Sequence, residues 1–360
     1  MNGYEAYRST KFFGSLDGLR ALSILAVIWH HCGWQKVPGE WAIAGTGYLG
    51  VHLFFVISGF LITTLLLREK EDTGRISLRD FYIRRTLRIF PLYYTVIGLY
   101  VVTVFLFENN PGDAREFFGN LPFFLTYTSN WFVQLEGRVI FYFAWSLAAE
   151  EQFYLVWPTV EKLLGVFAVP AVIGALLLAR TIVQETAPDA GLWATILISI
   201  PPAILGGVML AHVLHVPRTY AIAERVLGFR FSGPIFLAGL IAAMGLLAPK
   251  WTIWTLMTLV VGSAVVHERN GLPFLRWRPL VYVGTISYGM YLFHLLCWNA
   301  VKRVVPWDVL WLPATLALTI AVAGLSFRYY ESRFLALKKR FAGGSRARRQ
   351  PAPQAVQPVG

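Results

Sequence analysis

Long apolar runs alternate with short polar segments along almost the whole chain. Most runs are close to the ~20 residues that an α-helix needs to cross a bilayer. The pattern predicts an all-α, polytopic membrane protein with about ten membrane-spanning helices. The predicted spans are 16–34, 47–67, 89–107, 145–164, 167–183, 190–213, 231–248, 251–267, 279–301 and 309–328.

The apolar segment 117–144 departs from this pattern because several polar residues and a proline interrupt it. Irregular backbone is tolerated at membrane depth only where it packs against protein or lines a water-filled space. We therefore expect a re-entrant or surface hairpin, since a full crossing would put every later loop on the wrong side. The interrupting residues are Pro122, Asn130, Gln134, Glu136 and Arg138.

The composition supports a membrane protein: 56% of the residues are apolar and only 14% are charged, whereas a soluble domain is about 25% charged. Two cysteines, Cys32 and Cys297, define neither a disulfide framework nor a metal site. We expect residues 1–341 to form one transmembrane domain, inserted by its first span without a cleaved signal peptide. Residues 342–360, rich in Gly, Pro and Arg, are expected to form a disordered cytoplasmic tail.

The net charge of +12 is unevenly distributed. With the N-terminus in the cytoplasm, Lys and Arg follow the positive-inside rule, which predicts that both termini are cytoplasmic. The basic residues then face anionic headgroups, so the charge needs no nucleic-acid partner. The outer side receives Lys36, Arg115, Arg138, Arg180, Lys250, Lys302 and Arg303. The last two, adjacent in sequence, run against the rule, and the topology offers no reason for them.

The first span, LDGLRALSILAVIWHHC, carries Asp17 and Arg20 at its start and His30 and His31 at its end. Arg20 and His31 share one helix face about 16 Å apart along the axis, whereas His30 points about 80° away. Such polar groups are costly inside a bilayer. They indicate either a buried ion pair with a packed histidine, or a histidine that acts as a base on a buried reaction path.

Other predicted spans carry polar groups at a similar depth. His52 lies near the outer end of the second span and Ser58 near its middle, while Glu150 and Glu151 lie about two turns into the fourth. His294 lies in the outer half of the ninth span. A shared polar cavity would bring imidazole beside carboxylate, which is a general-base arrangement. The alternative is that these groups only cross-link helices by hydrogen bonds, and that Ser58 with the glycine after it allows close packing.

Three arginines, Arg84, Arg85 and Arg88, come just before the third span on the predicted cytoplasmic side. Three arginines at this position could bind the phosphate of a ligand. A topology signal that contacts lipid phosphate would have the same sequence pattern. Because Asp17 and Arg20 open the first span on this side, we expect an anionic cofactor to enter from the cytoplasm and a base to lie deeper.

Five ordered motifs carry a family resemblance: LDGLRALSILAVIWHH, GVHLFFVISGFLIT, FYIRRTLRIFPLYY, WSLAAEEQFYLVWP and ISYGMYLFHLL. Over about residues 14 to 341 the chain resembles the acyltransferase 3 family of membrane O-acyltransferases. The resemblance implies a bacterial plasma-membrane enzyme that moves an acetyl or other short acyl group from cytoplasmic acyl-coenzyme A to a hydroxyl. Acceptors in that family include surface polysaccharides, peptidoglycan, lipid-linked sugars and macrolides.

The resemblance also suggests roles for residues. The family's arginine–histidine motif matches Arg20 and His31, its arginine-rich motif matches Arg84 to Arg88, and its acidic motif matches Trp145 to Tyr154. One departure is His52, where the family usually carries Asp. Another carboxylate, Glu150 or Glu151, would then have to orient the catalytic histidine. The hydrolase-like domain fused to some members is not found, so we expect a standalone enzyme.

The resulting hypothesis is that the arginines bind the phosphates of acyl-coenzyme A, most simply acetyl-coenzyme A, and that His31 deprotonates the acceptor hydroxyl. Direct transfer and transfer through an acyl-histidine both fit. The candidate substrate-site residues are Asp17, His52, Ser58, Trp145, Tyr154 and His294. Alternatives are a sensor that only binds its ligand and a proton-coupled transporter or flippase. Transport predicts inverted repeats with broken helices and gives the arginines no role. The sequence sets neither the acceptor nor the oligomeric state.

Overall fold

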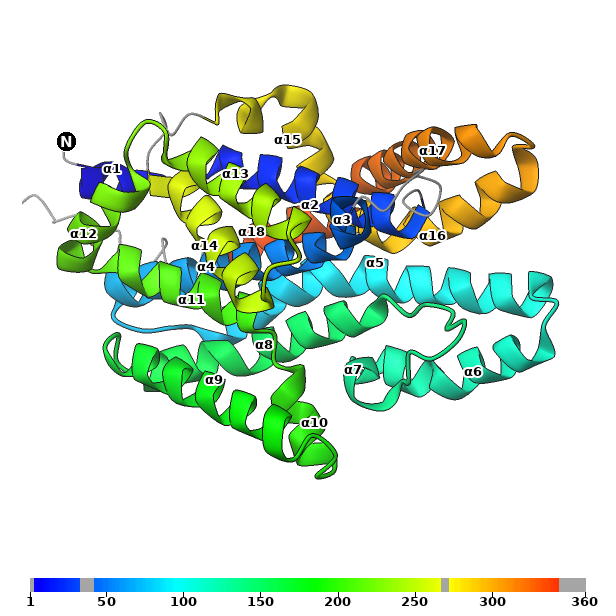
Figure 1. The fold of residues 1–360 in the computed structure, drawn as a ribbon, viewed down its shortest axis with the longest axis horizontal. Coiled ribbons are helices and arrows are strands. Elements are labelled where there is room, and N and C mark those ends of the chain that lie inside the picture. The colour runs from blue at the N-terminus through cyan, green and yellow to red at the C-terminus, as the bar shows by residue number, and fades with distance from the viewer. Residues whose placement is uncertain (1–2, 33–41, 267–271, 343–360) are drawn as a thin grey trace, which may run out of the picture.

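The computed structural model describes residues 3–32, 42–266 and 272–342, and every regular element within these ranges is helical. Residues 343–360 of the predicted tail lie outside them. The α-helices are α1 (Gly3–Ser9), α2 (Gly14–Cys32), α3 (Ala42–Gly45), α4 (Leu49–Thr73), α5 (Leu78–Phe107), α6 (Pro111–Leu125), α7 (Ser129–Phe132), α8 (Ala144–Leu163), α9 (Ala168–Thr186), α10 (Leu192–Ser199), α11 (Pro202–His215), α12 (Pro217–Leu227), α13 (Ser232–Gly245), α14 (Lys250–Val266), α15 (Arg278–Thr285), α16 (Ser287–Val304), α17 (Trp311–Ser326) and α18 (Ser332–Ala342). A π-helix at Phe327–Glu331 joins the last two (Figure 1).

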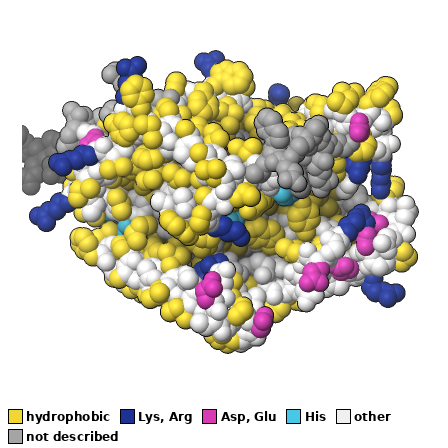
Figure 2. All heavy atoms as spheres, in the orientation of Figure 1, with side chains coloured by type: hydrophobic (Ala, Val, Ile, Leu, Met, Phe, Trp, Pro, Cys, Tyr) yellow, Lys and Arg dark blue, Asp and Glu magenta, His cyan; other side chains and the backbone are white. Residues whose placement is uncertain are grey.

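The all-α, polytopic class predicted from the sequence is confirmed. Within the described residues, four helices are long and apolar enough to cross a membrane: Thr46–Thr73, Leu78–Phe107, Ala168–Thr186 and Asp308–Leu337. Counting each of four bent helix pairs as one span gives up to eight, so the predicted count of ten stays a prediction. Apolar side chains cover most of the face in Figure 2, and charged ones concentrate toward its ends and lower edge.

Two predicted spans are broken helices. The span predicted at 190–213 is α10 followed by α11, bent by 50° at Pro201 and Pro202. Proline lacks the amide hydrogen that continues a helix and restricts the residue before it, which explains the break. The span predicted at 279–301 is α15 followed by α16, bent by 75° at Ile286. No proline lies at this second bend.

The segment predicted as a hairpin, 117–144, forms α6, α7 and a loop that leads into α8 (Figure 1). The hairpin segment begins at Pro111, earlier than predicted. The Asn110 side chain caps the first turn of α6 there by accepting a hydrogen bond from the Gly112 amide at 2.9 Å. The hairpin packs on α5, where the Tyr93 hydroxyl donates to the Phe124 carbonyl at 2.8 Å.

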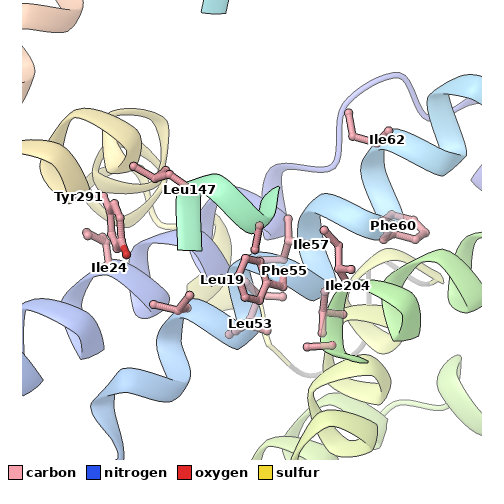
Figure 3. Close-up of a cluster of buried hydrophobic side chains, with 14 of the residues drawn as sticks. Leu19, Ile24, Leu53, Phe55, Ile57, Phe60, Ile62, Leu147, Ile204 and Tyr291 are labelled. Carbon is pink, nitrogen blue, oxygen red and sulfur yellow. The ribbon is translucent and has the colours of Figure 1, made fainter. Parts of the chain in front are cut away.

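The core forms around α2 and α4. In Figure 3, buried side chains from α2, α4, α8, α11 and α16 meet in one cluster that includes Leu19, Phe55 and Ile204. The backbones of α4 and α11 touch at glycines: a Cβ on Gly59 would lie 2.0 Å from the Ile204 carbonyl oxygen. Close approach through small residues is the usual way for helices to pack in a membrane.

The helix directions give the bundle two distinct ends. We call the end where α2, α5 and α16 begin the proximal end, and the end where they finish the distal end (Figure 1). The opposite direction of α8 follows from its contacts: late in α8, the Leu155 carbonyl accepts from Tyr82 near the start of α5. Phe143, just before α8, packs against Tyr100 further along α5.

Candidate functional site

Two histidines meet at the end of α2. The Nδ1 atom of His31 lies 2.7 Å from Nε2 of His294, which sits in the middle of α16. Their rings are nearly parallel, with centroids 5.0 Å apart at an interplanar angle of 17°. Tyr142 packs edge-on to His31 at 5.2 Å, and the His294 side chain is fully buried. The His31 ring therefore faces protein groups.

Hydrogen bonding assigns the tautomers of this pair. Nδ1 of His294 lies 2.6 Å from the carbonyl oxygen of Tyr291, and because a carbonyl only accepts, this nitrogen carries a hydrogen. A neutral His294 then presents the lone pair of Nε2 to His31, whose Nδ1 must donate. The free lone pair of His31 is consequently on Nε2, the form in which imidazole acts as a base.

The prediction that Glu150 or Glu151 orients His31 is not what the structure shows. The Glu150 carboxylate accepts hydrogen bonds from the Ser58 and Tyr154 hydroxyls. Tyr154 lies one helical turn after Glu150 on α8, so the two side chains share a face. Glu150 and Glu151 both line a cavity that also contains arginines. The group that orients His31 is another imidazole.

The first cavity, which we call the proximal cavity, has a volume of about 100 Å³. It lies where α2, α4, α5, α8 and α16 converge, so elements far apart in sequence build it together. Its polar lining consists of Arg20, Ser58, Arg85, Arg88, Ser146, Glu150, Glu151, Tyr154, Ser287, Tyr288 and Tyr291.

The predicted arginine clamp divides in two. Arg84 is directed away from the cavity and forms an ion pair with Glu69 at 3.3 Å. Arg85 and Arg88 line the cavity, because positions three apart share a helix face while adjacent positions diverge by about 100°. Arg85 lies over the ring of Tyr154, 3.8 Å from its centroid.

The cationic groups of the proximal cavity are only partly neutralised. Arg20 pairs with the buried Asp17 at 2.8 Å. In the described ranges, neither Arg85 nor Arg88 has a carboxylate oxygen within 4.0 Å. Glu150 and Glu151 line the same cavity without forming such a pair with either arginine. An arginine that lines a cavity and forms no direct ion pair suits a bound anion.

A larger cavity of about 600 Å³ lies at the distal end, and we call it the distal cavity. The last turns of α5 and α16 and the loop before α8 form it, and Tyr142 both lines it and packs on His31. Its polar and aromatic lining consists of Tyr100, Thr103, Phe107, Glu108, Arg138, Phe141, Tyr142, Asn299, Lys302 and Arg303.

The histidine pair separates these cavities. On the proximal side, the Tyr291 hydroxyl lies 2.5 Å from the Ser146 hydroxyl and donates to the Phe143 carbonyl at 3.1 Å. This hydrogen-bonded wall stands between the proximal cavity and His294, since both Tyr291 and Ser146 line that cavity. On the distal side, Tyr142 separates His31 from the distal cavity.

His52 and Trp145 do not join the histidine pair. They line a third, lateral cavity of about 260 Å³, and Nδ1 of His52 accepts a hydrogen bond from Trp254 at 2.5 Å. The prediction that one polar cavity holds His31, His52, Glu150 or Glu151, and His294 is therefore wrong. Equal depth along two helices does not make their side chains face each other, because helix rotation decides that.

Comparison with known families identifies the chain. Residues 13–328 match the family model described as an acyltransferase domain, and they contain every polar group of both cavities. The chain belongs to the acyltransferase 3 family. The match confirms the resemblance carried by the five motifs, and it covers α2, α5, α8 and α16 of the acyltransferase domain.

The curated relatives are longer than this chain. Peptidoglycan O-acetyltransferase OatA of Listeria monocytogenes is 28% identical over 90% of this chain and 56% of its own length. YrhL of Bacillus subtilis, named as a candidate peptidoglycan O-acetyltransferase, is 28% identical over 91% and 56%. The chain thus spans just over half the length of these relatives. No solved structure matches it.

Proposed function

We propose that this membrane protein is an O-acetyltransferase that carries an acetyl group from acetyl-coenzyme A, bound at the proximal end, to a hydroxyl at the distal end. The observation that carries the proposal is the hydrogen-bond chain from His31 through His294 to the Tyr291 carbonyl. It leaves His31 Nε2 as a free base between a cationic cavity and a larger open one. The positive-inside distribution supports a cytoplasmic proximal end.

The proximal cavity supports an anionic donor. Among the described residues, Arg85 and Arg88 have no carboxylate oxygen within 4.0 Å, although Glu150 and Glu151 line the same cavity, and their guanidinium groups suit phosphate oxygens. The α2 helix spans about 16 Å from Arg20 to His31, a distance that an extended pantetheine arm covers in large part. The thioester approaches the histidine pair past Tyr291 and Ser146.

In the proposed step, His31 Nε2 takes the proton of the acceptor hydroxyl while the oxygen of that hydroxyl attacks the thioester carbonyl carbon. The C–O bond forms, the C–S bond breaks, and His31 returns the proton to the leaving thiolate. General-base catalysis of this kind contributes about 10²- to 10⁴-fold. A two-step route through an acetylated Nε2 uses the same atoms, and acid-quenched single turnovers would detect labelled protein if it operates.

The test uses the purified chain in vesicles, labelled acetyl-coenzyme A on either face and peptidoglycan fragments as first acceptor, because two relatives are named for that substrate. We expect label on the acceptor only when the donor meets the proximal end. His31→Ala should lower turnover about 10²-fold or more. His294→Ala should lower it similarly, and His294→Gln, whose amide oxygen can accept from His31 Nδ1, should recover part of it.

Near-normal turnover of His31→Ala in correctly inserted protein would remove that residue from the mechanism. The rival function is proton-coupled transport of a glycan or small molecule. The breaks at α10/α11 and α15/α16 are a feature that transporters share. Movement of the acceptor across the vesicle without labelled product would favour transport. Transfer without movement would favour the enzyme.

A further inference from the structure

Two basic residues at the distal end are held by aromatic rings instead of acids. Lys302 Nζ lies 5.4 Å from the ring centroid of Trp298 and 5.3 Å from that of Trp311. The Arg303 guanidinium lies 5.6 Å from the centroid of Phe107. In the described part of the chain, neither has a carboxylate within 4.0 Å. Cation–π contacts position a charge without cancelling it.

The distal cavity therefore carries a surplus of positive charge. Its third cation, Arg138, is neutralised by Glu108 at 2.9 Å and by Asp113. Lys302 and Arg303 have no such counter-charge, and both line the cavity and are exposed. They are also the pair that violates the positive-inside rule in the predicted topology, so orientation in the membrane does not account for them.

We propose that the distal cavity is the acceptor subsite and that Lys302 and Arg303 bind an anionic group, carboxylate or phosphate, of an acidic glycan. This inference rests on the proposed function, in which a hydroxyl reaches His31 from the distal side. Tyr142 lines the cavity and contacts the catalytic ring, so a glycan in the cavity lies one side chain from the base. The volume of about 600 Å³ is within the range of ligand pockets.

The lining of the distal cavity suits the sugar itself as well as the anionic group that the sugar carries. Phe107 and Tyr142 supply aromatic surface, while Asn299 and Thr103 add hydrogen-bonding groups. A pocket that is largely apolar with a few placed polar groups fixes the orientation of its ligand. Charge at the rim then selects among ligands of similar shape and speeds their association.

The test measures binding, so that it does not depend on chemistry. The detergent-solubilised full chain is titrated with two probes, a tetrasaccharide of glucuronate and the neutral tetrasaccharide of glucose. We expect the acidic probe to bind about tenfold more tightly at low salt, and the preference to fall as salt is added. The double variant Lys302→Gln with Arg303→Gln should bind both probes equally.

The matched control removes two other basic residues predicted on the outer side, Arg115→Gln with Lys250→Gln, which do not line the distal cavity. It changes the net charge equally and should keep the preference. Equal binding of the two probes by the unaltered chain would overturn the proposal. An unchanged preference in the Lys302 and Arg303 variant would also overturn it. So would loss of the preference when phosphatidylglycerol micelles are added at the same charge concentration, since Lys302 and Arg303 would then bind lipid headgroups.

The two proposals fail separately. If the preference is found but no acetyl transfer occurs, the acidic subsite stands and the proposed reaction falls. If transfer occurs with no preference for the acidic probe, the reaction stands and this inference falls.

Discussion

The role of His31 depends on the atom that faces its Nδ1. A carboxylate there would favour the imidazolium, whereas the Nε2 lone pair of His294 holds a neutral imidazole in one tautomer. The second arrangement keeps charge out of a membrane interior, where it is costly. His294 is itself fixed by the Tyr291 carbonyl one helical turn earlier, so the orientation of the His31 ring depends on the α16 backbone.

The arginines make a prediction at the residue scale. If the proposed function holds, Arg88→Gln should raise the KM for acetyl-coenzyme A about tenfold with little change in kcat, because it would remove a charge-assisted contact to the donor phosphates. Arg84→Gln is the matched control, since this neighbour on the same helix pairs with Glu69 outside the cavity. Both are measured by steady-state kinetics. Equal effects of the two substitutions would mean that the arginines act on topology or lipid contact instead.

At the scale of helices, the α4–α11 crossing positions the part of α4 that carries Ser58. A Cβ on Gly207 would lie 2.1 Å from the Val56 carbonyl oxygen, a distance that the backbones can accommodate only by separating. Gly207→Ala should therefore destabilise the fold by about 1–3 kcal/mol, as overpacking does. Thermal unfolding in detergent measures this effect.

Gly98→Ala is the control for that substitution. Gly98 lies inside α5 with nothing within 4 Å of its added Cβ, so alanine there should be neutral or stabilising. If Gly207→Ala unfolds at the same temperature as the unaltered chain, the crossing is looser than the backbone contact indicates.

Also at the scale of helices, the ion pair between the loop before α8 and the end of α5 should make the stability of the fold depend on pH. Its Arg138 bridges Glu108, after α5, and Asp113 in α6. The hydrogen bond from Arg138 lowers the pKa of Glu108 from its ordinary value of 4.5. This bond therefore stabilises the fold above that value, and its contribution is lost as the pH falls through the lowered pKa.

Glu108→Gln tests the pH effect. The variant should unfold at a lower temperature than the unaltered chain at pH 7, and the difference should shrink as the pH falls below about 4.5. Its size is expected to be small, about 1 kcal/mol or less, because the pair is partly exposed. If the difference in unfolding temperature stays constant from pH 7 to pH 3, the charge of Glu108 does not stabilise the loop.

At the scale of the whole molecule, Tyr291 connects the histidine pair to the proximal cavity and Tyr142 connects it to the distal cavity. In the proposed function, the donor and the acceptor enter from opposite sides of the membrane, so a barrier between them would keep water away from the thioester. The side chains of Tyr291, Ser146 and Tyr142 form that barrier. It is built from α8, α16 and the loop before α8, so the site requires the assembled bundle.

The sequence alone determined the membrane class, the helical content, the family and the shared face of Arg20 and His31. These depend on local properties: apolar length, helical periodicity and short motifs. It also marked the basic pair Lys302 and Arg303 as anomalous, because the charge rule applies to each loop separately.

Only the tertiary structure decided which polar groups meet. His31 and His294 are 263 residues apart, and their contact depends on how α2 and α16 rotate and cross. A step of about 100° between adjacent helix positions separates Arg84 from Arg85, and depth along a helix axis says nothing about that direction. The physical reason is that a pattern specifies which face of a helix is apolar, whereas packing between distant helices selects the neighbour of each polar side chain.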